Sequence, residues 1–304
     1  MTKTLVLTGK PGSKSVTPTL VSDARAALAR AGAEVSEAKA LSPDDASELD
    51  FQGLQPKDTT EVLADFAANV PVDFSVIPSQ GRRKMLLVAD MDSTIITAEC
   101  IDELADLVGL KDQVSGITER AMRGELEFES ALRERVALLK GLQTSILPKV
   151  FEERIELTPG ARELVATMNA TGAFTALVSG GFSFFTGRVA KLVGFQFEQA
   201  NALLEKNGAL TGKVGEPILG RDAKKSALGK FRDERKLDAS ATMAVGDGAN
   251  DLAMIEAAGL GVAFRAKPLL AEAADAHILH GDLTALLYLQ GYRVEEFQAV
   301  SSPA

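Results

Sequence analysis

From about residue 82 onward, short continuous runs of apolar residues recur along the chain, and each run ends abruptly in polar residues or glycine. The runs occupy residues 85–89, 174–178, 242–245, 261–264 and 276–279. Strands that are apolar on both faces are typical of a parallel sheet covered by helices on each side. In such sheets, ligands bind beyond the carboxyl ends of the strands, where these polar residues fall. The pattern therefore predicts an α/β fold with a doubly wound parallel sheet and a site at that edge.

Residues 1–80 carry a different, self-contained pattern. Apolar runs and amphipathic stretches alternate there in the order strand, helix, strand, strand, helix, strand, at residues 4–7, 17–31, 34–40, 47–52, 59–69 and 72–77. This order predicts a ferredoxin-like α+β domain. Residues 78–81, Pro-Ser-Gln-Gly, predict a linker to the second domain.

A helix-rich insertion separates the first two strands of the predicted parallel sheet. Within residues 99–156, charged and apolar residues recur at helical spacing. We interpret this insertion as a helical cap over the edge of the sheet that carries the site. The core domain then consists of residues 82–98 and 157–295. The basic triplet Arg82-Arg83-Lys84 is expected to be solvated at the start of the first strand.

The composition disfavours several classes of partner and location. The 304 residues carry 33 Lys and Arg against 42 Asp and Glu, a net charge of −9 that disfavours binding to nucleic acid and to anionic membranes. No segment approaches the ~20 consecutive apolar residues that a membrane helix needs. Residues 1–11 lack the pattern of a signal peptide, so a cytoplasmic location is expected.

The residue inventory also limits the chemistry. The only cysteine, Cys100, cannot form an internal disulfide and is expected to be a buried thiol. The only histidines, His277 and His280, nearly exclude a histidine-rich metal site or a Ser-His-Asp triad, and both are expected to be partly buried or at the surface. The chemistry must then use carboxylates, lysine, hydroxyls and backbone groups.

Two carboxylates, Asp90 and Asp92, directly follow the first strand of the predicted parallel sheet. Two such charges about 4 Å apart repel by roughly 4 kcal/mol at an effective dielectric of ~20, so a cation is expected between them. Asp247 and Asp251 arrive from another strand end, and four acidic groups without a local histidine or thiolate favour Mg²⁺. Taken alone, residues 90–94 are equally well explained as a helix cap and turn.

A set of four motifs in chain order favours the metal site. Asp90-x-Asp92-x-Thr94 is followed by Ser179 in Val-Ser-Gly-Gly, by Lys224 and by Gly-Asp-Gly-x-Asn-Asp at residues 246–251. Over residues 85 to about 290, this set resembles the haloacid dehalogenase-like phosphatase superfamily. The resemblance implies that Asp90 attacks the phosphorus to form an aspartyl-phosphate. It also implies that Asp92 protonates the leaving oxygen and later deprotonates the attacking water.

The resemblance implies roles for the residues that bind the phosphoryl group. Ser179 and the Gly180 amide would donate hydrogen bonds to its oxygens, and Gly181 belongs to the same phosphate-binding segment. A lysine would neutralise its charge and restrain the nucleophile. Lys224 fits this role better than its neighbour Lys225, because its spacing to the last motif matches the family.

The last motif would complete the metal site. By the same resemblance, Asp247 would bind Mg²⁺ together with Asp90 and the backbone carbonyl of Asp92. Asp251 would orient a metal-bound water or the lysine, and Asn250 would contact the phosphate or the substrate.

The predicted cap carries residues that resemble the phosphoserine phosphatase family. The matching segments are Asp92-Ser-Thr-Ile-Ile-Thr-Ala-Glu99, Ala121-Met-Arg-Gly124, Phe128 and Leu132-Arg-Glu-Arg-Val136. The resemblance implies that Arg135 binds the substrate carboxylate in bidentate fashion and that Glu99 binds its ammonium group. Met122 and Phe128 would help to close the site against water. From composition alone, Glu99 and Arg135 would be ordinary solvated helix charges.

The position of residues 1–80 resembles that of the small amino-acid-binding regulatory domain called ACT. The resemblance implies serine as a regulator, and the alternative is a docking or dimerisation domain in a homodimer.

Two further functions stay open at this point. One is the same chemistry on another small phosphate ester, or phosphoryl transfer to an amino-acid hydroxyl such as that of homoserine. The other is an amino-acid-sensing regulator with a vestigial catalytic half.

Overall fold

The computed structural model describes residues 2–298, apart from the side chains of residues 56, 57, 60, 65 and 67. Its N-terminal part contains β1 (Lys3–Gly9), α1 (Pro18–Arg30), β2 (Glu34–Val35), β3 (Lys39–Ser42), β4 (Ala46–Gln52), α2 (Pro56–Ala67) and β5 (Val72–Pro78). The antiparallel strands have the order β2-β4-β1-β5, and β3 also pairs with β4. This is the predicted ferredoxin-like arrangement, with the second strand split into two short pieces.

The two faces of this N-terminal sheet have different neighbours. Successive residues of a strand point to opposite faces. Leu5 and Leu7 of β1 pack with Leu28 of α1, whereas Val6 belongs to the large core of the rest of the chain. Helix α1 starts where Thr17 caps it by accepting a hydrogen bond from the Leu20 amide, 3.2 Å away. The sheet is therefore held between its own helices and the second domain.

The second domain is built on a six-stranded parallel sheet with the order β13-β12-β11-β6-β7-β8. Its strands are β6 (Leu86–Ala89), β7 (Phe174–Phe182), β8 (Phe197–Asn201), β11 (Thr242–Gly246), β12 (Gly261–Phe264) and β13 (Ala276–Ile278). The helices that connect and cover them are α7 (Ala161–Ala170), α8 (Ser183–Val193), α9 (Arg221–Glu234), α10 (Leu252–Ala257), α11 (Pro268–Ala273) and α12 (Ala285–Leu289). Leu87 and Leu86 of β6 enter different apolar clusters, so both faces of the sheet are buried, as predicted.

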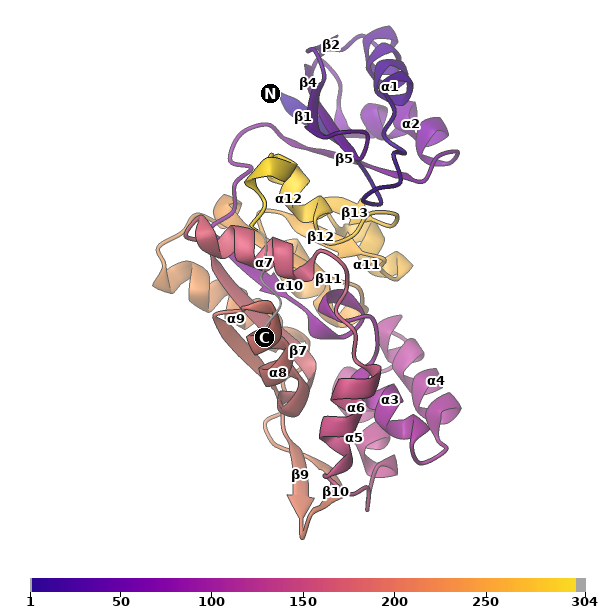
Figure 1. Cartoon of the computed structure of the whole chain (residues 1–304), viewed down its shortest axis with the longest axis vertical. Coiled ribbons are helices and arrows are strands. Elements are labelled where there is room, and N and C mark those ends of the chain that lie inside the picture. Colours follow the sequence, from indigo (N-terminus) through magenta and orange to yellow (C-terminus); the bar gives the residue numbers. More distant parts are fainter. Residues whose placement is uncertain (1, 299–304) are drawn as a thin grey trace.

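A helical insertion covers the carboxyl edge of this sheet (Figure 1). It contains α3 (Cys100–Asp106), α4 (Lys111–Met122), α5 (Phe128–Leu138) and α6 (Ile146–Arg154). A hairpin of β9 (Leu203–Lys206) and β10 (Ala209–Val214) joins it, because the backbones of Leu210 and Leu142 are linked at 2.8 Å. The hairpin lies in the range assigned to the core domain, and the domain boundaries themselves stay predictions.

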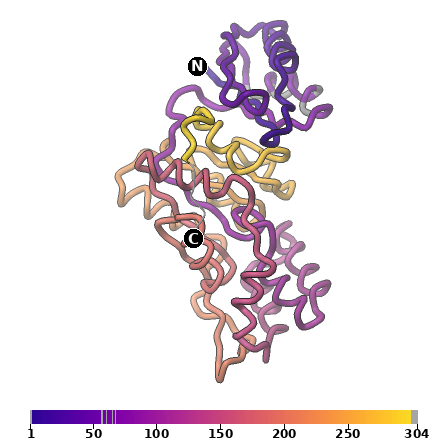
Figure 2. Tube along the Cα trace, in the orientation of Figure 1, coloured from indigo at the N-terminus to yellow at the C-terminus, as the bar shows by residue number. Residues whose placement is uncertain are grey.

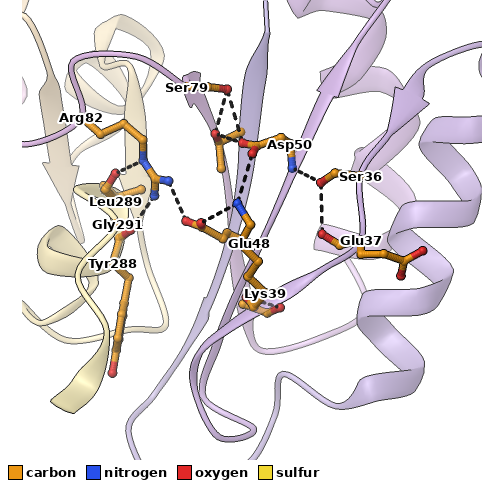
Figure 3. A network of polar contacts seen from close by, with 12 residues as sticks. Ser36, Glu37, Lys39, Glu48, Asp50, Ser79, Arg82, Tyr288, Leu289 and Gly291 are labelled. Carbon is orange, nitrogen blue, oxygen red and sulfur yellow. Dashed lines mark hydrogen bonds and ion pairs between the residues drawn. The ribbon is translucent and has the colours of Figure 1, made fainter. Parts of the chain in front are cut away.

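The linker between the two sheets is fixed by a largely buried arginine, as Figure 3 shows. The Arg82 side chain is 11% exposed, and its Nη1 lies 2.6 Å from Glu48 of β4. Its Nε and Nη2 donate to the carbonyl oxygens of Leu289 and Tyr288, both at 2.9 Å. Lys84 is also buried. The prediction of a solvated triplet is therefore wrong for Arg82 and Lys84 and right only for Arg83.

Asp73 makes a second link between the domains. Its carboxylate, on β5, accepts hydrogen bonds from the amides of Leu279, His280 and Gly281 at 2.8 to 3.0 Å. The trace in Figure 2 shows the N-terminal domain and the helical insertion at opposite ends of the molecule, with the parallel sheet between them. None of the described helices is long and apolar enough to cross a membrane.

Candidate active site

The predicted polar clusters meet at the carboxyl edge of the parallel sheet. Strand β6 lies between β7 and β11, so Asp90, Ser179 and Asp247 emerge side by side. The pairing of β7 with β8 is interrupted between Val178 and Phe182. Residues 179–181 therefore leave the regular ladder, and all three line the cavity at this edge of the sheet.

Lys224 of α9 joins two of the acidic residues. Its side chain is 2% exposed, and the ammonium group lies 2.8 Å from Asp90 Oδ1 and 2.6 Å from Asp251 Oδ1. Burial alone would lower the pKa of Lys224, but the charges of Asp251 and Asp90 raise it above its usual value. The neighbouring Lys225 is exposed. Lys224 is therefore a permanent cation beside Asp90.

Asp90, Asp247 and Asp251 form an acidic cluster in which one carboxylate oxygen of each lies within 4.8 Å of the others. Burial, with Asp251 adding to it, raises the pKa of Asp90 to about 7 against the opposite effect of Lys224. Burial and the nearby Glu99 raise the pKa of Asp247 well above its usual value. These carboxylates repel one another and lack enough cationic partners.

The free oxygens of this cluster fit a hard divalent cation. Asp251 Oδ1 contacts Lys224, and its Oδ2 accepts from the amides of Asp247 and Gly248, both at 3.2 Å. In the described part of the chain, no hydrogen bond reaches Oδ2 of Asp90 or of Asp247. Carboxylate oxygens are the ligands that Mg²⁺ prefers. The residues present therefore fit a hard divalent cation held by Asp90 and Asp247.

Asp92 is held from two sides. The loop at residues 91–95 turns sharply at Ser93, whose φ of 55° lies in the left-handed region. Asp92 Oδ1 accepts from the Cys100 amide at 2.8 Å, and its Oδ2 accepts from Ser179 Oγ at 3.2 Å. Burial raises the pKa of Asp92, which favours the protonated acid that a leaving group needs.

Two glycines permit the close approach of neighbouring groups. A Cβ at Gly181 would lie 2.6 Å from Asp92 Oδ2, and a Cβ at Gly180 would lie 2.4 Å from Cζ of Phe128. The Gly181 amide donates to Ser179 Oγ at 2.8 Å. A side chain at either position would therefore displace a neighbouring side chain, so glycine is favoured there by space rather than by backbone angle.

The cap contributes one carboxyl group and one guanidinium group. Glu99 is partly buried and accepts from Ser93 Oγ at 2.7 Å. Burial and the nearby Asp92 raise the pKa of Glu99 to about 8. Arg135 is buried, and among the described residues no carboxylate forms an ion pair with it. The two groups are therefore not ordinary solvated helix charges.

A cavity of about 30 Å³ lies between cap and sheet, with room for about two water molecules. Asn250 Oδ1 is buried without a hydrogen-bond partner among the described residues. Free Cys100 is buried beside the cavity, as expected. The predicted residues that line the cavity are Asp90, Asp92, Glu99, Met122, Phe128, Arg135, Ser179, Gly180, Gly181 and Asn250.

Comparison with known proteins identifies the family. Residues 87–256 match the haloacid dehalogenase-like hydrolase family. A phosphoserine phosphatase of Streptomyces coelicolor is 42% identical over 264 residues, which are 86% of this chain and 64% of that protein. A solved structure described as a phospho-aspartyl intermediate analogue of phosphoserine phosphatase is 41% identical and has a TM-score of 0.65, covering 68% of this chain and 98% of its own. The chain belongs to the phosphoserine phosphatase family of haloacid dehalogenase-like hydrolases.

The likeness to this family extends beyond the parallel sheet. A haloacid dehalogenase-family hydrolase of Salmonella enterica serovar Typhi has a TM-score of 0.80 and 27% identity, covering 95% of this chain and 98% of its own. The N-terminal domain is therefore included in the match. The chain spans just under two thirds of the length of the Streptomyces coelicolor phosphatase.

Asn201 is a residue of this phosphatase-family site that the sequence patterns did not reveal. It ends β8 and is buried. Its Nδ2 donates to the carbonyl oxygens of Gly180 at 2.8 Å and Leu219 at 3.2 Å, and its Oδ1 accepts from the Leu219 amide at 2.7 Å. Asn201 thus joins the phosphate-binding segment to the chain that enters α9, the helix of Lys224. The only sequence signal is a polar residue that closes a weak, partly polar strand.

Proposed function

We propose that the protein hydrolyses O-phospho-L-serine to L-serine and phosphate, the last step of serine biosynthesis. The observation that carries this proposal is that one cavity holds groups suited to a phosphate, an ammonium group and a carboxylate. Asp90, restrained by Lys224, faces a cap that presents Glu99 and a buried Arg135 without a carboxylate partner among the described residues. Phosphoserine offers a phosphate, an ammonium group and a carboxylate, which complement these three positions. The relatives described as phosphoserine phosphatases support the same substrate.

The first chemical step transfers the phosphoryl group to the enzyme. An oxygen of Asp90 attacks the phosphorus, a new bond to the carboxylate forms, and the bond to the serine oxygen breaks. Asp92 gives its proton to that departing oxygen. Ser179 and the Gly180 amide donate to the phosphoryl oxygens, and Lys224 offsets their charge.

The second step regenerates the enzyme. Asp92, now a carboxylate, takes a proton from water as the water oxygen attacks the phosphorus. The bond from phosphorus to Asp90 breaks, and inorganic phosphate leaves. Mg²⁺ bound by Asp90, Asp247 and the carbonyl oxygen of Asp92 would supply positive charge to the phosphoryl oxygens during both steps.

Access to the site requires movement of the cap. The cavity of about 30 Å³ is smaller than any phosphate monoester. Substrate must therefore enter while α3 to α5 stand away from the sheet, and the helices then close over it to exclude water. Met122 and Phe128, which line the cavity from the cap, would complete that closure.

The deciding experiment is a phosphate-release assay with L-phosphoserine, with and without Mg²⁺, on the parent and on Asp90→Asn. We expect Mg²⁺-dependent turnover in the parent and a loss of more than ~10³-fold in the variant, because the nucleophile is gone. Phosphothreonine and sugar phosphates serve as competing substrates. Equal rates on all of these esters would contradict the assignment of phosphoserine.

For the N-terminal domain we propose regulation by serine, and pairing of two chains is the alternative. A groove of about 400 Å³ between α1 and the β3–β4 hairpin carries Arg25 and Glu37, which pair with each other at 2.6 Å and would exchange that pair for the charged groups of an amino acid. Titration calorimetry with serine, together with sedimentation of the chain, distinguishes the two roles. A cytoplasmic location belongs to the same proposal, since serine biosynthesis is a metabolic reaction of that compartment.

A further inference from the structure

A chain of hydrogen bonds crosses three helices of the cap and ends at Arg135. Thr118 of α4 accepts from Arg135 Nη1 of α5 at 3.0 Å. The same hydroxyl donates to Asp102 Oδ1 of α3 at 2.8 Å. Thr118 is buried and Asp102 is partly buried. None of the chemical steps described above uses Asp102 or Thr118.

The guanidinium group of Arg135 is only partly satisfied by the protein. Of its five N–H donors, Nε donates to the Ala131 carbonyl at 3.1 Å and Nη1 donates once, to Thr118. In the described part of the chain, no group accepts from the other donors. Arg135 lines the cavity. The unpaired donors are therefore those that a substrate carboxylate can accept from, and the two existing bonds set where they point.

The proton of the Thr118 hydroxyl has two competing acceptors. Thr118 Oγ1 lies 3.0 Å from the Val114 carbonyl oxygen of its own helix and 2.8 Å from Asp102 Oδ1. A threonine that bonds only its own helix would be an ordinary structural feature. A bond to a charged acceptor is the stronger one, and donation to Asp102 leaves a lone pair of the hydroxyl facing Arg135. Asp102 thus polarises Thr118 toward the arginine without contacting the arginine directly.

We propose that Thr118 and Asp102 are positioning residues that aim Arg135 at the carboxylate of the substrate. The proposal rests on the proposed function, because the carboxylate in question is that of phosphoserine. It also connects, through α3, the two cap residues that would bind the substrate, Glu99 and Arg135. The Asp102 amide donates to the Glu99 carbonyl at 3.1 Å, so the residue that orients Arg135 lies one turn after the residue facing the ammonium group.

The test compares two substrates that differ by the carboxylate alone, L-phosphoserine and O-phosphoethanolamine. For Thr118→Val we expect KM for phosphoserine to rise about 10-fold, corresponding to about 1.4 kcal/mol, with kcat changed less than about 3-fold. KM for phosphoethanolamine stays within about 2-fold of the parent, because that ester has no carboxylate for Arg135 to bind. Thr118→Ser retains the hydroxyl and restores the parent KM.

Two further variants make the test decisive. Thr144→Val removes a hydroxyl that bonds the Gly208 carbonyl at the cap hairpin, away from Arg135, and should leave both substrates unchanged. Thr118→Val in an Arg135→Met background should cause no additional loss on phosphoserine. Equal losses on both esters, or additive losses in the double variant, would overturn the positioning role. A parent that releases no phosphate from phosphoserine would overturn the proposed function instead.

Discussion

The side-chain amide of Asn201 holds the carbonyl oxygen of Gly180 at 2.8 Å, and this one bond orients the peptide that follows Gly180. The N–H group of that peptide belongs to Gly181 and donates to Ser179 Oγ. Ser179 in turn donates to Asp92. The position of the proposed proton donor is thereby set through three consecutive hydrogen bonds that begin at the edge of the sheet.

Replacing Asn201 by alanine should therefore impair catalysis as well as stability. We expect kcat/KM on phosphoserine to fall by at least about 10-fold, with an unfolding free energy lower by about 1–3 kcal/mol. Asn169→Ala is a matched control, because Asn169 also bonds a glycine carbonyl, that of Gly194, but far from the site. A similar loss of kcat/KM in both variants would show that Asn201 has only a structural role.

Adding a methyl group at Gly180 should hinder closure of the cap. Its Cβ would lie 2.4 Å from Cζ of Phe128, so Gly180→Ala is expected to lower kcat/KM by about 10-fold or more. Phe128→Leu makes room at the same point. The double variant should lose less than the sum of the single losses, as measured in a double-mutant cycle. Additive losses in the double variant would mean that the added methyl group does not act through Phe128.

The acidic cluster predicts opposite effects of one substitution on activity and stability. Without metal, Asp247→Asn removes a repelling buried carboxylate, so its melting temperature with a chelator present should exceed that of the parent. With Mg²⁺ added, the parent should gain thermal stability by binding, and the variant should gain little and lack phosphatase activity. Differential scanning fluorimetry with EDTA or Mg²⁺ measures both effects. An equal shift by Mg²⁺ in the two proteins would exclude Asp247 as a ligand.

The ion pair of Arg82 and Glu48 should contribute far more to stability than an exposed pair does. Glu48→Ala leaves a nearly buried guanidinium with only carbonyl partners, and we expect the unfolding free energy to fall by about 2–4 kcal/mol. Glu37→Ala is the control, because Glu37 is 83% exposed and its pair with Arg25 should contribute less than about 1 kcal/mol. Urea denaturation measures both. Equal losses of unfolding free energy in the two variants would indicate that burial does not strengthen the ion pair of Arg82 and Glu48.

His277 should make the fold sensitive to mild acid. Burial lowers its pKa below 6.5, with His280 adding to this effect and Asp73 opposing it, and its Nε2 is buried without a partner among the described residues. Below pH 6.5, the unfolded chain binds a proton that the folded chain does not. The free energy of unfolding should therefore fall as the pH drops below that value and level off below the folded pKa. Two other charged residues, Lys3 and Asp275, line the same cavity as His277. Both are present in the parent and in the variant that is compared with it.

The measurement is urea denaturation from about pH 8 to about pH 5, on the parent and on His277→Gln. The decrease toward low pH should be smaller in the variant. His280→Gln is the control and should retain most of the decrease, because burial of His277, the larger cause of its lowered pKa, is unchanged. A decrease of the same size in His277→Gln would mean that other groups cause the acid sensitivity.

The sequence predicted those parts of the site that follow continuous apolar strands. Asp90, Ser179 and Asp247 could be placed together because parallel strands end at one edge and their motifs occur in a fixed order. Strand β8 was missed because Phe197-Glu-Gln-Ala-Asn201 is an edge strand with polar residues, and its pattern is that of a loop. Without β8 there was no position for Asn201, and its role could not be inferred.

The contacts of charged residues were the least predictable. Arg82 looked solvated because its partners, Glu48 of β4 and the carbonyl groups at the end of α12, are distant from it in the sequence. Asp102 and Thr118 carry no motif of their own. Their relationship to Arg135 depends on how three cap helices pack, which no local pattern contains.

The small volume beneath the cap also bears on phosphorylated proteins. A phosphoserine within a polypeptide has no free carboxylate or ammonium group, and its chain continues in both directions. The cavity of about 30 Å³ has room for about two water molecules and none for two chain segments, and Glu99 and Arg135 would face neutral peptide groups. Under the proposed function, phosphoproteins should therefore be much poorer substrates than the free amino acid, and enclosure of the site alone would separate metabolism from signalling.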